Sequence, residues 1–168
     1  MSLLDRLARL SGAASAVSLA AIGVVITAQI VARLAGQQIP AADDFAAWAM
    51  AASAFLALPY AMRHGDHIRV TLVLQFLPKT LHKAFELLAS AIGVALAGWA
   101  AFHTTMFVYD SWQFDEVAQG MVKVPLWIPQ LSMAVGMALL VLMLADRLLR
   151  CITGRPLPDA GADVARTE

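Results

Sequence analysis

The sequence predicts an all-α membrane protein with four transmembrane helices. Of its 168 residues, 60% are hydrophobic and only 14% are charged, whereas soluble domains are typically about 45–50% apolar and about 25% charged. Four long stretches contain no Asp, Glu, Lys or Arg: residues 13–32, 45–62, 87–109 and 124–145. A hydrocarbon core about 30 Å thick needs roughly 20 helical residues, and a single segment in lipid must pair its own backbone groups. Each stretch therefore predicts a helix that crosses the bilayer.

The first stretch follows Arg6 and Arg9, a pattern that signal peptides share. It is longer than an ordinary signal core and three more spans follow, so we expect it to remain as a span. The second stretch is the shortest and meets the length requirement only marginally. The fourth begins near Pro125 and Pro129, and proline is well tolerated at a helix start.

A shorter apolar segment, residues 68–78, lies between the second and third stretches and ends at Pro78. It is too short to cross and charges flank it, which predicts an interfacial segment on the membrane surface, with a short buried loop as the alternative. Residues 1–152 are predicted to form one membrane domain. Residues 153–168 combine Pro, Gly and charge without an apolar face, which predicts a disordered cytoplasmic tail.

The distribution of Lys and Arg predicts the orientation. Ten of the twelve lie in the N-terminal segment, the loop after the second span and the C-terminal segment, and the other two are Arg33 and Lys123. Cytoplasmic loops are enriched in Lys and Arg, so both termini are predicted to be cytoplasmic. The opposite loops are acidic, and aromatic residues gather at that predicted interface: Trp48, Tyr109, Trp112 and Trp127.

Small residues recur at four-residue spacing in three of the spans, which predicts faces where helices approach closely, either within the bundle or with a partner. They are Gly12, Ala16 and Ala20; Ala49, Ser53 and Ala57; and Ala89, Gly93, Ala97 and Ala101. Arg33 and the pair Asp43 and Asp44 lie at neighbouring span ends on the same side. An Arg33–Asp44 ion pair or separate solvation of both groups fits this placement.

The spans are poor in the ionisable groups that transport paths and pumps place at mid-membrane. A membrane haem needs two histidines at similar depth, but His64, His67 and His82 are predicted at one surface and His103 near the other. The single Cys151 excludes an intramolecular disulfide. We therefore expect no enzyme and no catalytic, cofactor or metal site, and the zero net charge predicts no nucleic-acid partner.

Several short motifs follow one another in an order that resembles a known family. Ile30-Val31-Ala32-Arg33 closes the first span, Asp44 precedes the second, Met62-Arg63-His64-Gly65-Asp66-His67-Ile68-Arg69-Val70 follows it, Pro78 comes next, and Val124-Pro125-Leu126-Trp127 opens the fourth span. From the first span to about Arg150, the chain resembles the small membrane subunit, the DctQ-like component, of tripartite ATP-independent periplasmic (TRAP) transporters. It departs from the family at Leu34, where an aromatic residue is common, and at Thr71, where an acidic residue is common.

The resemblance implies a non-catalytic scaffold in the bacterial inner membrane. Such subunits associate with a large membrane subunit that carries the transport path and the sodium sites, and a periplasmic binding protein delivers an organic anion, commonly a carboxylate. Membrane lipids surround both subunits. The alternatives are a haem-binding redox anchor and a self-sufficient homo-oligomeric transporter. The candidate structural and partner-contact residues are Arg33, Asp44, Arg63, Gly65, His67, Arg69, Pro78, Pro125 and Trp127.

The loop of residues 110–123 between the third and fourth spans is predicted to face the periplasm. It mixes aromatic and acidic side chains, and we expect Asp110, Asp115 and Glu116 to approach the periplasmic binding protein. The sequence alone leaves the transported substrate and the contact faces of the helices open.

Overall fold

The computed structural model describes residues 3–64 and 79–154. They form four long helices: α1 (Leu3–Leu34), α2 (Ala42–Arg63), α4 (Lys79–Gln113) and α5 (Trp127–Thr153). All four are long and apolar enough to cross a membrane, which confirms the predicted fold class. The predicted interfacial segment, residues 68–78, and all but the first two residues of the predicted tail lie outside the described residues.

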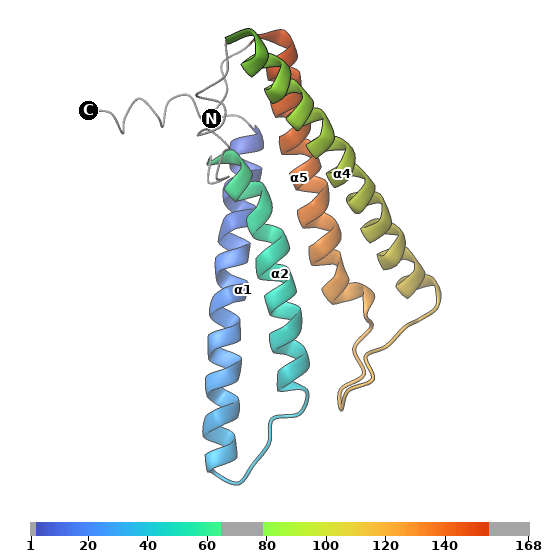
Figure 1. The fold of residues 1–168 in the computed structure, drawn as a ribbon. Coiled ribbons are helices and arrows are strands. Elements are labelled where there is room, and N and C mark those ends of the chain that lie inside the picture. Colours follow the sequence, from blue (N-terminus) through green and yellow to red (C-terminus); the bar gives the residue numbers. More distant parts are fainter. Residues whose placement is uncertain (1–2, 65–78, 155–168) are drawn as a thin grey trace, which may run out of the picture.

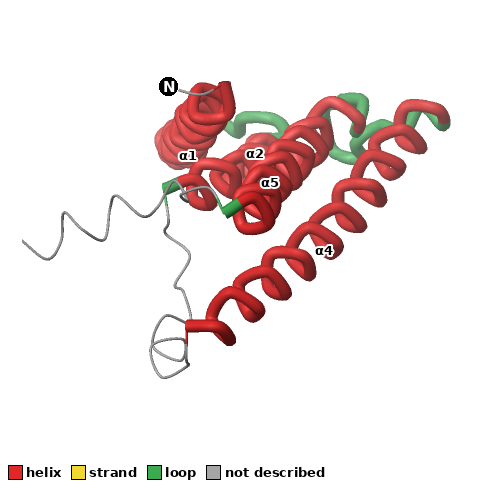
Figure 2. The backbone as a smooth tube through the Cα atoms, turned by 90° about the horizontal axis from the view of Figure 1, so that it is seen from above, coloured by secondary structure: helices red, strands yellow, loops and turns green. Residues whose placement is uncertain are grey.

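The helices form two antiparallel hairpins, α1–α2 and α4–α5, which meet where α2 packs on α5 (Figure 1). The order in space is α1, α2, α5, α4, so α1 and α4 lie on opposite flanks. Seen from above, α4 diverges from the other three helices (Figure 2). The start of α1, the end of α2, the start of α4 and the end of α5 share one end, here called the terminal end. The two hairpin connections share the opposite end, here called the loop end.

The helices extend beyond the uncharged stretches of the sequence. Helix α1 begins at Leu3 and therefore includes Asp5, and α5 continues to Thr153 and therefore includes Asp146 and Arg150. A helical backbone holds each side chain at a defined height and direction. These three charged groups at the terminal end are thus placed by helices.

Serine hydroxyls join α1 to α2. Ser11 Oγ donates to the carbonyl oxygen of Leu56, and Ser15 Oγ donates to that of Ser53 over 2.7 Å. Hydroxyl groups that bond across helices stabilise pairs of helices in membranes, where apolar contact offers no advantage over lipid.

The small-residue stripe predicted for the first span packs within the chain only in part. Gly12 lies against the ring of Tyr60, where a Cβ would come within 2.7 Å of ring carbons. Ala16 and Ala20 are exposed, and Ala8 is buried instead. The contact stripe of α1 therefore runs through Ala8, Gly12 and the two serines, because the hydroxyl bonds to α2 set the rotation of α1.

The two hairpins make close contact at a proline of α2 and a glycine of α5. Pro59 is fully buried inside α2, and because proline has no N–H, α2 offers no amide donor to the carbonyl of Phe55 four residues earlier. Gly136 of α5 lies against this carbonyl, and a Cβ at residue 136 would sit 2.5 Å from its oxygen. The missing side chain lets the α5 backbone approach the Phe55 oxygen, as in the Cα–H···O contacts of close helix pairs.

The second hairpin closes through small residues of α4. Ala97 is buried, and a Cβ at residue 93 would lie 3.6 Å from a side-chain carbon of Leu144, which is ordinary contact distance. Ala89, in the same predicted stripe, is exposed. Nearer the terminal end, Ala8, Met62 and Met143 form a buried cluster from three helices.

Candidate functional site

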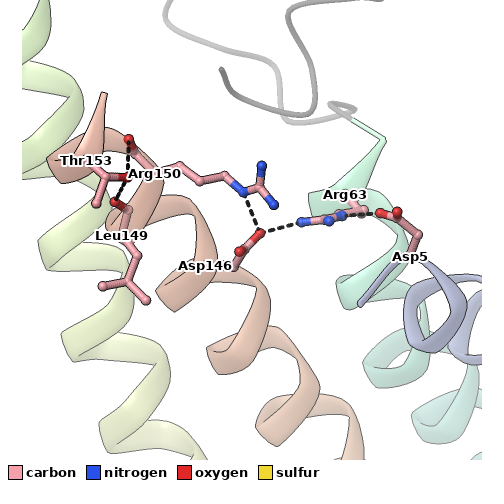
Figure 3. Close-up of polar contacts among 6 residues, drawn as sticks. All are labelled: Asp5, Arg63, Asp146, Leu149, Arg150 and Thr153. Carbon is pink, nitrogen blue, oxygen red and sulfur yellow. Dashed lines mark hydrogen bonds and ion pairs between the residues drawn. The ribbon is translucent and has the colours of Figure 1, made fainter. Parts of the chain in front are cut away.

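Four charged residues meet at the terminal end directly beside the buried cluster. Arg63, the last residue of α2, donates from Nε to Asp5 Oδ1 of α1 and from Nη1 to Asp146 Oδ2 of α5, each over 2.7 Å (Figure 3). Arg150 Nε donates to the same Asp146 oxygen over 2.9 Å from one turn further along α5. Asp5, Arg63, Asp146 and Arg150 are called the Arg63 cluster below.

The Arg63 cluster joins three helices with balanced charge. The Arg63 side chain is only 8% exposed, whereas Asp5 and Asp146 retain 33% and 20% exposure. A guanidinium presents donors on several edges of a rigid plane, so one arginine can bond two carboxylates from different helices. Because the arginine is buried and its partners come from α1 and α5, the cluster sets the position of the first hairpin relative to α5.

The sequence pointed to Arg63 as a partner-contact candidate, and the structure pairs it within the chain. Asp5 and Asp146 were not among the predicted candidates. The predicted orientation depends on Lys and Arg, so the carboxylates on the same side did not enter it. A signal was present. Asp5 lies in the first turn of α1 and Asp146 directly follows the fourth uncharged stretch, so both carboxylates belong to helix ends on the same side as Arg63.

An open pocket of about 240 Å³ lies at the loop end between α1, the start of α2 and Met121. Arg33, Asp43 and Asp44 all line it. Within the described chain, Arg33 and Asp44 do not form the ion pair that the sequence suggested. The physical reason is the position of Asp44: its Oδ2 lies so close to Gly120 that a Cβ there would overlap it. An oxygen of the Asp44 carboxylate thus lies against the connection after α4.

The last three residues of α4 and the connection to α5, together residues 111–126, are here called the loop-end hairpin. The backbone N–H of Ala118 donates to the Val124 carbonyl, and that of Leu126 donates to the Glu116 carbonyl, each over 2.9 Å. Fully buried Ser111 donates from Oγ to Glu116 Oε2 over 2.8 Å. These bonds give the loop-end hairpin a defined shape with one isolated bridge between Val117 and Pro125.

The predicted docking residues differ in their roles within this shape. Asp110 and Asp115 are exposed, and Asp115 has a left-handed backbone with φ of 48°, which aspartate tolerates better than most residues. Glu116 is exposed but also accepts the Ser111 hydrogen bond. Apolar side chains are exposed beside them, with Phe114 at 70% and Met121 at 79%.

The remaining candidates are distributed as follows. Pro125 closes the loop-end hairpin and Trp127 begins α5, whereas Gly65, His67, Arg69 and Pro78 lie outside the described residues. His64 stacks on Tyr60 at the terminal end, with ring centroids 3.9 Å apart, and His103 lies on α4 toward the loop end. The two histidines whose side chains are described therefore stand at different depths. No group of three or more potential metal ligands occurs among the described residues.

Comparison with known families identifies the chain. A search of curated proteins found no match. The family described as tripartite ATP-independent periplasmic transporters, DctQ component, matches residues 22–154. The match runs from the middle of α1 to the end of α5 and includes Arg63, Asp146 and the loop-end hairpin. The chain therefore belongs to the DctQ family and is a small membrane component of a TRAP transporter.

Proposed function

We propose that this chain is the scaffold for the large membrane subunit of a sodium-coupled importer of organic acids. Membership of the DctQ family makes it a multi-pass membrane component that associates with other TRAP components. The proposal adds that the large subunit carries the sodium and substrate sites, that a periplasmic binding protein delivers a carboxylate, and that this chain holds the large subunit in place.

The observation that carries the scaffold role is the polarity of the interior. Apart from the Arg63 side chain at the terminal end, the buried polar side chains among the described residues are Ser11, Ser90, Ser111 and Gln130, none of them ionisable. A path for sodium and a carboxylate needs charged or strongly polar groups near the middle of the membrane. In the described chain, the Arg63 cluster lies at the terminal end and the pocket lined by Arg33 and Asp44 lies at the loop end. Neither is near the middle of the helices, which supports a transport path in the partner.

The orientation is part of the same proposal. The start of α1 and the end of α5 share the terminal end, and the excess of Lys and Arg there favours the cytoplasm. Both termini would then lie on the cytoplasmic side of the bacterial inner membrane. The loop-end hairpin would face the periplasm, where the binding protein is found.

Reconstitution tests the proposed function. The chain, the large subunit and the binding protein are combined in liposomes with an inward sodium gradient, and uptake of labelled organic acids is measured. Uptake is expected only with all three components and with the gradient. Transport by this chain alone would show a self-sufficient transporter, and full uptake without this chain would contradict the scaffold role.

Neutralising Asp110 and Asp115 is expected to weaken productive docking of the binding protein. The double change Asp110→Asn and Asp115→Asn removes two exposed charges, and asparagine retains the left-handed backbone at residue 115. Charges at the rim of an interface act mainly on the rate of encounter. The binding-protein concentration that gives half-maximal uptake is therefore expected to rise roughly three- to tenfold.

The control is Asp43→Asn, which removes an exposed charge at the loop end outside the hairpin. Glu116 is left unchanged because its carboxylate holds Ser111. The amount of large subunit that co-purifies should be the same for all variants. An unchanged half-maximal concentration in the double variant would rule out docking through these two side chains.

A further inference from the structure

A histidine on the outer flank of α4 has no hydrogen-bond partner among the described residues. His103 is exposed, and its ring lies 4.6 Å from that of Trp99 and 5.5 Å from that of Phe102, centroid to centroid. The neighbouring hydroxyls of Thr104 and Thr105 donate to carbonyls one turn back. In the part of the chain that the structure describes, neither ring nitrogen of His103 forms a comparable bond.

The depth of this histidine makes the missing bond costly. Asp110 follows seven residues later in the same helix, so His103 lies about 10 Å below the level of that charge at about 1.5 Å per residue. Trp99 lies one turn deeper and is 66% exposed, although tryptophan favours the membrane surface. Polar groups within the hydrocarbon are retained where they face protein or water and not lipid.

His103 and Trp99 belong to one continuous face of α4. Exposed residues follow one another every three or four positions along it: Leu88, Ile92, Ala95, Trp99, His103 and Met106. This set is called the Trp99–His103 face. At 100° per residue it lies opposite Ala97, which is buried. Because α4 lies at the flank of the row and packs on α5 (Figures 1 and 2), the face points away from the rest of the chain.

We propose that the Trp99–His103 face is the contact surface for a transmembrane helix of the large subunit. That helix would carry an oxygen acceptor, such as a hydroxyl, carboxamide or carboxylate group, opposite His103. The inference rests on the proposed scaffold function and adds the face and the chemistry of the contact.

The chemistry favours a different chain over a second copy of this one. A neutral imidazole has one donor and one acceptor, and an indole has one donor only. Two copies meeting through the same face would therefore bring together more donors than acceptors. A partner helix with oxygen acceptors pairs with the N–H donors of both residues, and the two rings supply flat area for packing.

Photo-crosslinking in the intact transporter identifies the occupant of the face. A benzophenone amino acid replaces Trp99 or, in a separate variant, Met106, and after illumination the product is identified by mass spectrometry. The expected product joins this chain to the large subunit. A product of two copies, or a product with lipid alone, would overturn the proposal. Co-purification of the unmodified chain with the large subunit is scored first, so that a failure of the scaffold function itself is recognised separately.

Substitution of His103 tests the hydrogen bond. His103→Leu is expected to reduce the large subunit retained in detergent about three- to tenfold, the range that interhelical hydrogen bonds in membranes provide. His103→Gln keeps a donor and an acceptor and should restore much of the association. Met106→Leu, on the same face, is the matched control. Full retention with His103→Leu, or equal loss with Met106→Leu, would contradict a specific bond at His103.

Discussion

Replacing Arg63 with methionine is expected to lower the free energy of unfolding by about 2–3 kcal/mol. The change removes the ion pair between Arg63 and Asp5 of α1, and among the described residues Asp146 of α5 keeps its ion pair with Arg150. Removing one member of a fully buried ion pair typically costs about 3–5 kcal/mol. The expected loss is smaller because Asp5 and Asp146 are 33% and 20% exposed and can gain some hydration.

The measurement is unfolding by sodium dodecyl sulphate in mixed micelles, followed by circular dichroism and tryptophan fluorescence. Arg63→Lys should lose less, because an ammonium keeps the charge but lacks the planar fork that reaches both carboxylates. Arg9→Met, which removes an exposed arginine from α1, is the matched control. Adding Asp5→Asn and Asp146→Asn to Arg63→Met should recover part of the loss. Equal stability of the Arg63→Met and Arg9→Met variants would show that the cluster does not hold the helices together.

Replacing Gly136 with alanine is expected to destabilise the junction between the hairpins by about 1–3 kcal/mol, the usual cost of overfilling a packed interior. The added Cβ would meet the backbone carbonyl of Phe55 at 2.5 Å. A carbonyl cannot rotate away as a side chain can, so α2 and α5 must separate. Separation would also remove the close approach of α5 to a carbonyl that Pro59 leaves without an amide donor in α2.

Gly98→Ala is the matched control for this prediction. A Cβ at residue 98 meets nothing within 4 Å, so the change should be neutral or stabilise α4 by up to about 1 kcal/mol through helix propensity. Both variants are compared by the same detergent titration. Similar stability of the two alanine variants would mean that the α2–α5 contact tolerates a side chain at residue 136.

The two predictions depend on features that a single sequence reveals to different degrees. Arg63 is a candidate from the sequence because it follows the second span within a recognisable motif, but Asp5 and Asp146 are distant from it in the sequence by 58 and 83 positions. The sequence shows Pro59 as a proline near the end of the second span. It shows Gly136 as one of several small residues in the fourth span. Nothing local to either residue indicates that they meet, because the contact depends on how α5 is rotated and placed against α2.

The number and type of the helices were determined by the sequence itself. The reason is that lipid imposes local requirements: each crossing needs its own apolar length and its own backbone hydrogen bonds, and both are properties of contiguous residues. The DctQ resemblance followed from the order of short motifs along the chain, and the family match confirms it.

Only the tertiary structure decided which polar groups meet. It placed Arg63 between Asp5 and Asp146, placed Asp44 Oδ2 against Gly120, and left His103 exposed on the flank of α4. These outcomes depend on helix rotation and on distances between helices, which arise from packing of small residues and hydroxyl groups across interfaces. The sequence determined that four helices cross a membrane, and the packing between them decided which charges are paired within the chain.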